Sequence, residues 1–267
     1  MTISVIPGPL SMTPTVNTTT ADFAEPVQAG SLLIGCVAHA LSGTAPSTGP
    51  AGWTGLLQPA GFGHMAMFYK ADAAAGEPPA VFGTGGSGAN MRAVVAEVRG
   101  LPGAQLDQWT GTEATGGGGG SIVTVTAPSP DTQPGNLIVC MFFWNGGAAS
   151  PVTGTNIRDS SGTARPASVA AKDDGELVAA IKFAVTYLVA GSPLGTATNQ
   201  GTGSIGVFAS GRGLMASFKS AGEEPPPAGG ILARVGSQWV PAVPRGRTTT
   251  GWAPARIWDG TGWRPPR

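Results

Sequence analysis

Short apolar segments separated by turn residues recur along the first part of the chain. They are rich in Val, Ile, Leu, Phe and Met, and Gly, Pro, Asn or Asp bound most of them. The segments cover residues 31–40, 65–71, 91–100, 121–127, 136–145, 183–190, 204–210 and 214–220. Many short β-forming segments with turns between them are typical of a sandwich or barrel. The pattern predicts an all-β, jelly-roll-like antiparallel β-sandwich over residues 1–221.

An internal repeat refines this prediction. QAGSLLIGC (28–36) resembles QPGNLIVC (133–140), and MAMFYKADAAAGEP (65–78) resembles FAVTYLVAGSP (183–193). The second pair bears on residues 176–190, which contain no helix breaker and fit a helix as well as a strand. The repeat favours a strand, with Tyr187 at the position of Tyr69. Two related halves follow, either sharing one sandwich or forming two sandwiches of about 100 residues each.

Two segments rich in glycine or proline mark the expected boundaries. Gly116 to Gly120 is a run of five glycines, which cannot form a strand interior, so we place it as a loop joining halves of about 1–101 and 121–221. Residues 222–230 contain three consecutive prolines, which favour an extended spacer. The chain is therefore expected to end in a separate C-terminal arm, residues 231–267.

The charges are few and unevenly placed. Only 11% of the residues are charged, well below the roughly 25% usual for soluble domains. The 15 basic and 15 acidic residues cancel, but residues 231–267 hold six Arg and one Asp, so the arm is basic and the body acidic. No apolar run is long enough for a membrane span, and no signal peptide is visible at the N-terminus. Such a composition favours an assembled structural protein over a freely diffusing enzyme.

Candidate motifs for chemistry are weak. Residues 83–88 match GxGxxG, but the preceding strand is short and residues 201–206 match the same pattern, so we interpret both as glycine turns. KDDGE (172–176) reads as a tight hairpin turn, with weak calcium binding as the functional alternative. His39 and His64 belong to no cluster with zinc spacing. We expect no enzyme, no cofactor and no metal site.

The cysteines and two of the tryptophans each have a structural and a functional interpretation. Cys36 and Cys140 fall at matching points of the repeated segments, where free cysteines act as small buried hydrophobes. A disulfide between them would require Cα atoms within about 7 Å. Trp53 and Trp144 stand at loop–strand junctions, where capping of a sheet core is favoured over stacking on a sugar. Trp53 is the candidate glycan contact under the second interpretation.

The arm repeats itself. Residues 233–235 followed by Trp239-Val240-Pro241 return as residues 255–257 followed by Trp263-Arg264-Pro265. Asp259-Gly260 predicts a two-residue hairpin turn flanked by Trp258 and Thr261. Because short isolated hairpins are marginal in water, we expect these units to pack on a neighbouring subunit, with folding back on their own body as the alternative. The predicted assembly interface consists of Arg234, Trp239, Trp252, Arg256, Trp258 and Trp263.

These residues carry a resemblance. ARVGSQWVP and ARIWDGTGWRP resemble C-terminal repeats of actinobacteriophage virion proteins, especially minor tail proteins. PAGWTGL, MFYKADAAAGEP and VVAEVRGL are similar to a sandwich module of those proteins and of bacterial surface proteins, although residues 98–101 replace the module's aromatic closing motif.

The resemblance implies a structural virion component with no catalytic residues. We expect a homo-oligomeric minor tail protein at the tail tip or fibre, made in the host cytoplasm and located in the virion. A capsid decoration protein and a carbohydrate-binding module for host attachment are the alternatives. The expected partners are other copies of the chain, other virion proteins and, under the last alternative, a host cell-surface glycan. No nucleic-acid partner is expected.

Overall fold

The computed structural model divides the chain into two compact units, a body that ends at Ala221 and an arm from Gly222 to Arg267. In the body the structure describes residues 2–39, 48–57, 64–84, 89–115, 121–126, 135–145, 152–159, 161, 163–165, 167–173, 181–191, 198–203 and 210–221. In the arm it describes residues 232–235, 238–241, 245–248, 251–254, 257–258 and 263–264. All regular elements in these residues are strands, so the predicted all-β class is confirmed.

The body contains two sets of strands. The first set is β1 (Ser4–Pro7), β2 (Ser11–Val16), β3 (Thr18–Ala21), β4 (Leu32–His39), β5 (Thr54–Leu57), β6 (His64–Lys70), β7 (Ala80–Gly83) and β8 (Ala89–Arg99). The second set is β9 (Gln105–Thr115), β10 (Ser121–Thr126), β11 (Leu137–Asn145), β12 (Val152–Arg158), β13 (Ala164–Arg165), β14 (Ser168–Asp173), β15 (Ile181–Val189), β16 (Thr198–Gly203) and β17 (Ser210–Lys219).

Each set forms its own pair of sheets. The second set gives an inner sheet ordered β9-β17-β11-β15, with β14 beyond β15, and an outer sheet ordered β10-β16-β12-β13. Apart from the pairs β12–β13 and β14–β15, consecutive strands alternate between the two sheets, and the strand order of each sheet is that of a jelly roll. The first set repeats this order, with β1 and β2 beside β8, then β4, β6 and β5, and with β3 and β7 as its outer sheet. We call each pair of sheets a sandwich, and the two sandwiches belong to one compact unit.

Strand registers confirm the repeat residue by residue. Ile34 pairs with Tyr69 between β4 and β6, and Val139 pairs with Tyr187 between β11 and β15. The predicted equivalence of Tyr69 and Tyr187 is correct, and the segment around Tyr187 is a strand.

The predicted match of the two cysteines is wrong by one residue. The equivalence of Ile34 with Val139 pairs Cys36 with Met141 and Gly35 with Cys140. Cys36 joins the hydrophobic core between the sandwiches, and Met141 joins the same core. Because side chains alternate along a strand, Cys140 faces the other side of its sheet. The two copies of this segment keep a constant offset of 105 residues from Gln28 and Gln133 onward, and matching the cysteines would require a one-residue gap that the strand registers do not contain.

The junction between the sandwiches also differs from the expected one. Strand β9 begins the second sandwich at Gln105, so the two sandwiches join near residues 100–104. Gly100 and Gly103 have φ values of 79° and 57° there, a conformation that favours glycine. The glycine run at 116–120 lies between β9 and β10, within the second sandwich. Strand β9 escaped prediction because its sequence, QLDQWTGTEAT, is mostly polar.

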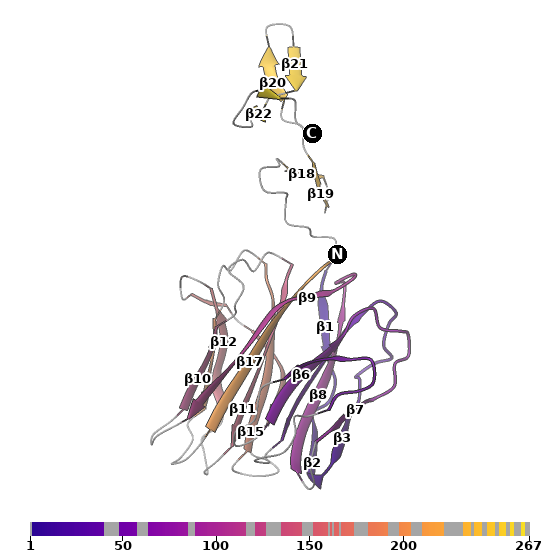
Figure 1. Cartoon of the computed structure of the whole chain (residues 1–267), viewed down its shortest axis with the longest axis vertical. Coiled ribbons are helices and arrows are strands. Elements are labelled where there is room, and N and C mark those ends of the chain that lie inside the picture. Colours follow the sequence, from indigo (N-terminus) through magenta and orange to yellow (C-terminus); the bar gives the residue numbers. More distant parts are fainter. Residues whose placement is uncertain are drawn as a thin grey trace. The chain divides into compact units, whose positions relative to one another are not determined.

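The inner sheets of the two sandwiches pack against each other (Figure 1). Their apolar side chains form one core cluster drawn from both halves, and Tyr69 meets Phe218 across it with ring centroids 5.4 Å apart. Burying each such side chain contributes about 1.5–3 kcal/mol. The outer pair β3 and β7 covers the other face of the first inner sheet through a second cluster that includes Phe82. Strand β4 is consequently buried along its whole length.

The described residues of the arm form three hairpins, where the sequence indicated two. They pair β18 (Leu232–Val235) with β19 (Gln238–Pro241), β20 (Arg245–Thr248) with β21 (Gly251–Pro254), and β22 (Ile257–Trp258) with β23 (Trp263–Arg264). Trp258 pairs directly with Trp263, which leaves four residues between them. The predicted two-residue turn at Asp259-Gly260 is therefore wrong.

Candidate functional site

A buried ion pair crosses the boundary between the two sandwiches. Arg92 on β8 donates a hydrogen bond from Nε to Oδ2 of Asp173 on β14, at 2.7 Å, and both side chains are 0% exposed. Within the described part of the chain, Nη1 and Nη2 of Arg92 have no hydrogen-bond partner. The pair is therefore a direct polar contact between two sheets whose shared core is apolar.

The repeat places a second buried arginine at the equivalent position. Arg92 pairs in register with Ala38, and Arg212 pairs with Phe143, the residue equivalent to Ala38. Arg212 is also almost fully buried. Both strands thus bring an arginine toward the space between the sandwiches, a feature that the sequence analysis missed. The sequence signal that could have predicted these buried arginines is an arginine shortly before an apolar run in both copies.

Asp173 corrects the interpretation of KDDGE. Lys172 and Asp173 belong to β14, and Asp173 pairs in register with Phe183 of β15. The strands are therefore not joined by a tight turn at residues 172–176. Residues 174–176 lie outside the described residues. Among those described, no cluster of three or more His, Cys, Asp or Glu could hold a metal ion.

The Arg92–Asp173 pair is suited to holding structure. Both partners are closed to solvent, so no substrate reaches them without separating the sheets. The geometry makes the pair a link between the sandwiches.

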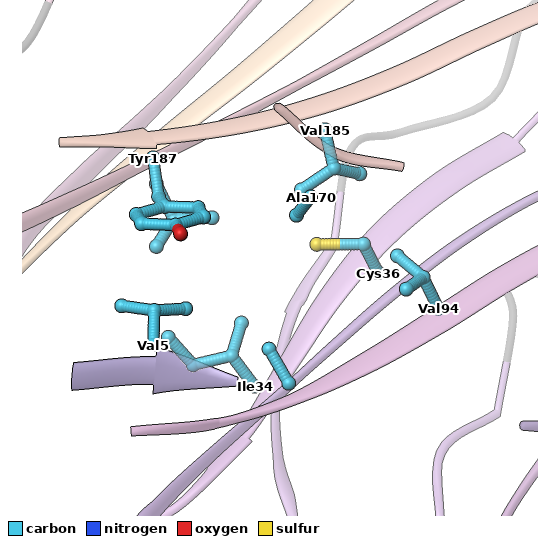
Figure 2. A pocket seen from close by; sticks show the side chains of 9 residues that line it. Val5, Ile34, Cys36, Val94, Ala170, Val185 and Tyr187 are labelled. Atoms are coloured by element: carbon cyan, nitrogen blue, oxygen red, sulfur yellow. The ribbon is translucent and has the colours of Figure 1, made fainter. Parts of the chain in front are cut away.

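A small cavity lies in the core between the sandwiches. Its volume is about 20 Å³, and Figure 2 shows Val5, Ile34, Cys36 and Val94 on one side of it and side chains of the second sandwich on the other. The opposite side is formed by Val139, Ala170, Val185 and Tyr187. A space of this size holds at most one water, and an apolar lining gives a water no partners. We interpret the cavity as a packing void.

Trp53 caps the outer core of the first sandwich. It is half-buried, packs against two core clusters and meets the ring of Phe82 edge-on, with centroids 6.5 Å apart and an interplanar angle of 83°. This is the capping role that the sequence favoured. A glycan contact by Trp53 stays a prediction. The side chain of Trp144 lies outside the described residues.

The two GxGxxG segments begin in strands of the outer sheets. Gly83 ends β7, and Gly201 and Gly203 lie in β16. Dinucleotide binding uses this motif between a strand and a helix, where the helix N-terminus receives the pyrophosphate. Both segments here connect a strand to a strand, β7 to β8 and β16 to β17. In the described parts of the chain no helix is long and apolar enough to cross a membrane.

A buried carboxylate fastens a turn to the first sandwich. Glu97 on β8 accepts hydrogen bonds from the Gln28 amide and the Ser31 hydroxyl, each at 2.7 Å, and pairs with Arg99, also at 2.7 Å. Burial alone would raise the pKa of the Glu97 carboxyl. The hydrogen bonds from Arg99, Gln28 and Ser31 outweigh burial and hold that pKa below its usual range.

The structure distributes the predicted assembly residues over the three hairpins of the arm. Arg234 pairs in register with Trp239, and Trp258 pairs with Trp263. Trp252 pairs with Arg247, which the sequence analysis overlooked. Arg256 lies outside the described residues. The missed middle hairpin follows the first at a spacing of 13 residues, with an arginine five residues before a tryptophan in both.

Comparison with known proteins gives no further constraint. No protein-family model matches the chain, and no curated protein matches it.

Proposed function

We propose that this protein is a structural component of a bacteriophage virion, a minor tail protein of the tail tip or fibre that assembles through its C-terminal arm. The observation that carries the proposal is that three short hairpins follow one another along the described part of the arm, each with at least one tryptophan and one arginine in its strands. The resemblance of the arm and body to actinobacteriophage tail proteins supplies the setting.

The hairpins are too small to be stable by themselves. Their strands have two to four residues each, and isolated two-stranded hairpins are marginal in water. Tryptophan and arginine dominate the energetics of protein interfaces, so the arm has the residues of a binding segment. Its basic balance complements the acidic balance of the body. A partner surface on another subunit would meet both requirements.

The body supports a structural role in a different way. Its two broad inner sheets are used to pack the sandwiches together, and the cavity between them is too small for a ligand. The ion pair at this boundary is closed to solvent. These features describe a rigid support that carries an arm.

Truncation after Gly230 tests the proposal. The shortened chain is expected to fold with an unchanged melting temperature, yet to remain monomeric and to be absent from assembled particles. A full-length variant with Trp239, Trp252 and Trp263 changed to alanine is the matched control, because it keeps the chain length. Normal incorporation of both variants into particles would overturn the proposal, and labelling of intact particles would separate a tail from a capsid location.

A further inference from the structure

Strand β9 forms one edge of the second inner sheet. It is 11 residues long and pairs with β17 on one side. Within the described residues no strand pairs with its other side. The backbone N–H and C=O groups on that side are a template for another strand, because they are the groups that form a sheet ladder.

The other edges of the inner sheets carry features that discourage such pairing. Strand β5 has only four residues, and β14 has a register shift and Lys172. Strands β1 and β2 contain Pro7 and Pro14, which cannot donate backbone hydrogen bonds. Strand β9 contains no proline and no lysine. Its one irregularity lies beside Asp107, so residues 108–115 pair with β17 in a regular register.

An exposed tryptophan on β9 and the charge of the body bear on which strand this edge would bind. Trp109 is 38% exposed, and it pairs in register with Ala216 of the central core, so it stands at the margin of that core. The ionisable residues of β9 are Asp107, which forms a 3.3 Å ion pair with Lys219, and Glu113, which pairs in register with Arg212. An antiparallel pair of two β9 strands centred on Thr110 would set Asp107 opposite Glu113, and like charges directly opposite are destabilising. The body that carries this edge is acidic overall, which favours a basic partner strand over a second copy of β9.

The arm contains a strand of the required kind. Strand β20 has the sequence RGRT, with two arginines and no proline. Its hairpin partner β21 ends in Pro254, so β20 is the strand whose outer edge keeps all its donors. Both edges of a two-stranded hairpin are open to further pairing.

We propose that β9 is the docking edge for the arm of a second copy of this chain. Strand β20 of one copy extends the inner sheet of another by pairing with β9, with Trp109 covered by the hairpin. This inference rests on the proposed function, since it names the surface that the assembly arm binds. Such a contact closes as a two-fold dimer where two copies exchange arms, and it builds a ring or a filament where each arm passes to the next copy.

Site-specific photocrosslinking of the full-length chain tests the inference. Trp109→Cys is labelled with a benzophenone maleimide, and Val169→Cys is the matched control, because Val169 is 53% exposed on β14 at the opposite edge of the same sheet. The native Cys36 and Cys140 are buried, so the maleimide should label them very little. The unaltered chain, treated in the same way, measures this background labelling. Mixing labelled chains with isotope-labelled chains identifies crosslinks between copies by mass spectrometry.

The expected result is a crosslink between copies from position 109 to arm peptides, and none from position 169. In parallel, Trp109→Lys is expected to weaken self-association about 30-fold or more, as for a central interface tryptophan, whereas Val169→Lys leaves it unchanged. Equal crosslinking from both positions would overturn the β9 site. The same holds if Trp109→Lys associates normally while truncation of the arm still abolishes assembly, and the proposed function would then stand. Assembly that survives truncation after Gly230 would instead overturn the proposed function.

Discussion

Removing the charge of Asp173 is expected to destabilise the body strongly. Asp173→Asn keeps the size of the side chain but leaves the Arg92 guanidinium buried without its counter-charge. Two unit charges about 4 Å apart interact by about 4 kcal/mol at the effective dielectric constant that suits protein sites. Breaking a buried ion pair by removing one partner costs about 3–5 kcal/mol, in agreement with that figure. For a body of this size, about 4 kcal/mol lowers the melting temperature by roughly 8–16 °C.

Equilibrium denaturation followed by circular dichroism measures this effect. Lys219→Met is the control, because Lys219 and Asp107 form a 3.3 Å ion pair whose side chains are 34% and 16% exposed. Such a pair contributes no more than about 1 kcal/mol. The double variant Arg92→Met with Asp173→Leu removes both charges and is expected to regain most of the lost stability. A loss below about 1 kcal/mol for Asp173→Asn would refute the view that this pair links the sandwiches.

Three further outcomes are expected. The folded-state pKa of Glu97 is lowered, so its contribution to stability is present above about pH 4.5 and is lost as the pH falls through the folded-state value. Acid denaturation of Glu97→Gln should therefore show a smaller loss of stability between neutral and acidic pH than the unaltered chain, and parallel curves would contradict this. Burial raises the pKa of the Cys36 thiol, so a thiol reagent at neutral pH should leave the native chain unlabelled and should label two cysteines in denaturant. Trp53→Ala should cost about 2 kcal/mol of stability, less than a fully buried tryptophan. A change in glycan binding at unaltered stability would instead favour a sugar contact.

The sequence by itself determined the central strands of this protein. Strands β4, β6, β8, β11, β15 and β17 were predicted within a few residues, because strands covered on both faces read as continuous apolar runs. The repeat also determined that the two halves share a strand order, and the equivalence of Tyr69 and Tyr187 followed from it. The proline-rich spacer marked the end of the body near Ala221.

The tertiary structure decided the edges, the faces and the buried charges. Strands β9 and β16 are polar, and they become strands through partners far along the chain, so no local pattern announced them. The faces of Cys36 and Cys140 depended on a one-residue shift that reverses the direction of a side chain.

The Arg92–Asp173 pair is the clearest case of a feature that only the tertiary structure reveals. An arginine and an aspartate 81 residues apart read as ordinary surface charges or turn residues in the sequence. A charge can be buried when a counter-charge meets it, and only the packing of one sandwich on the other brings Arg92 to Asp173. The local sequence therefore determines the apolar central strands, and the three-dimensional packing determines which polar segments join them as strands and which polar residues act together.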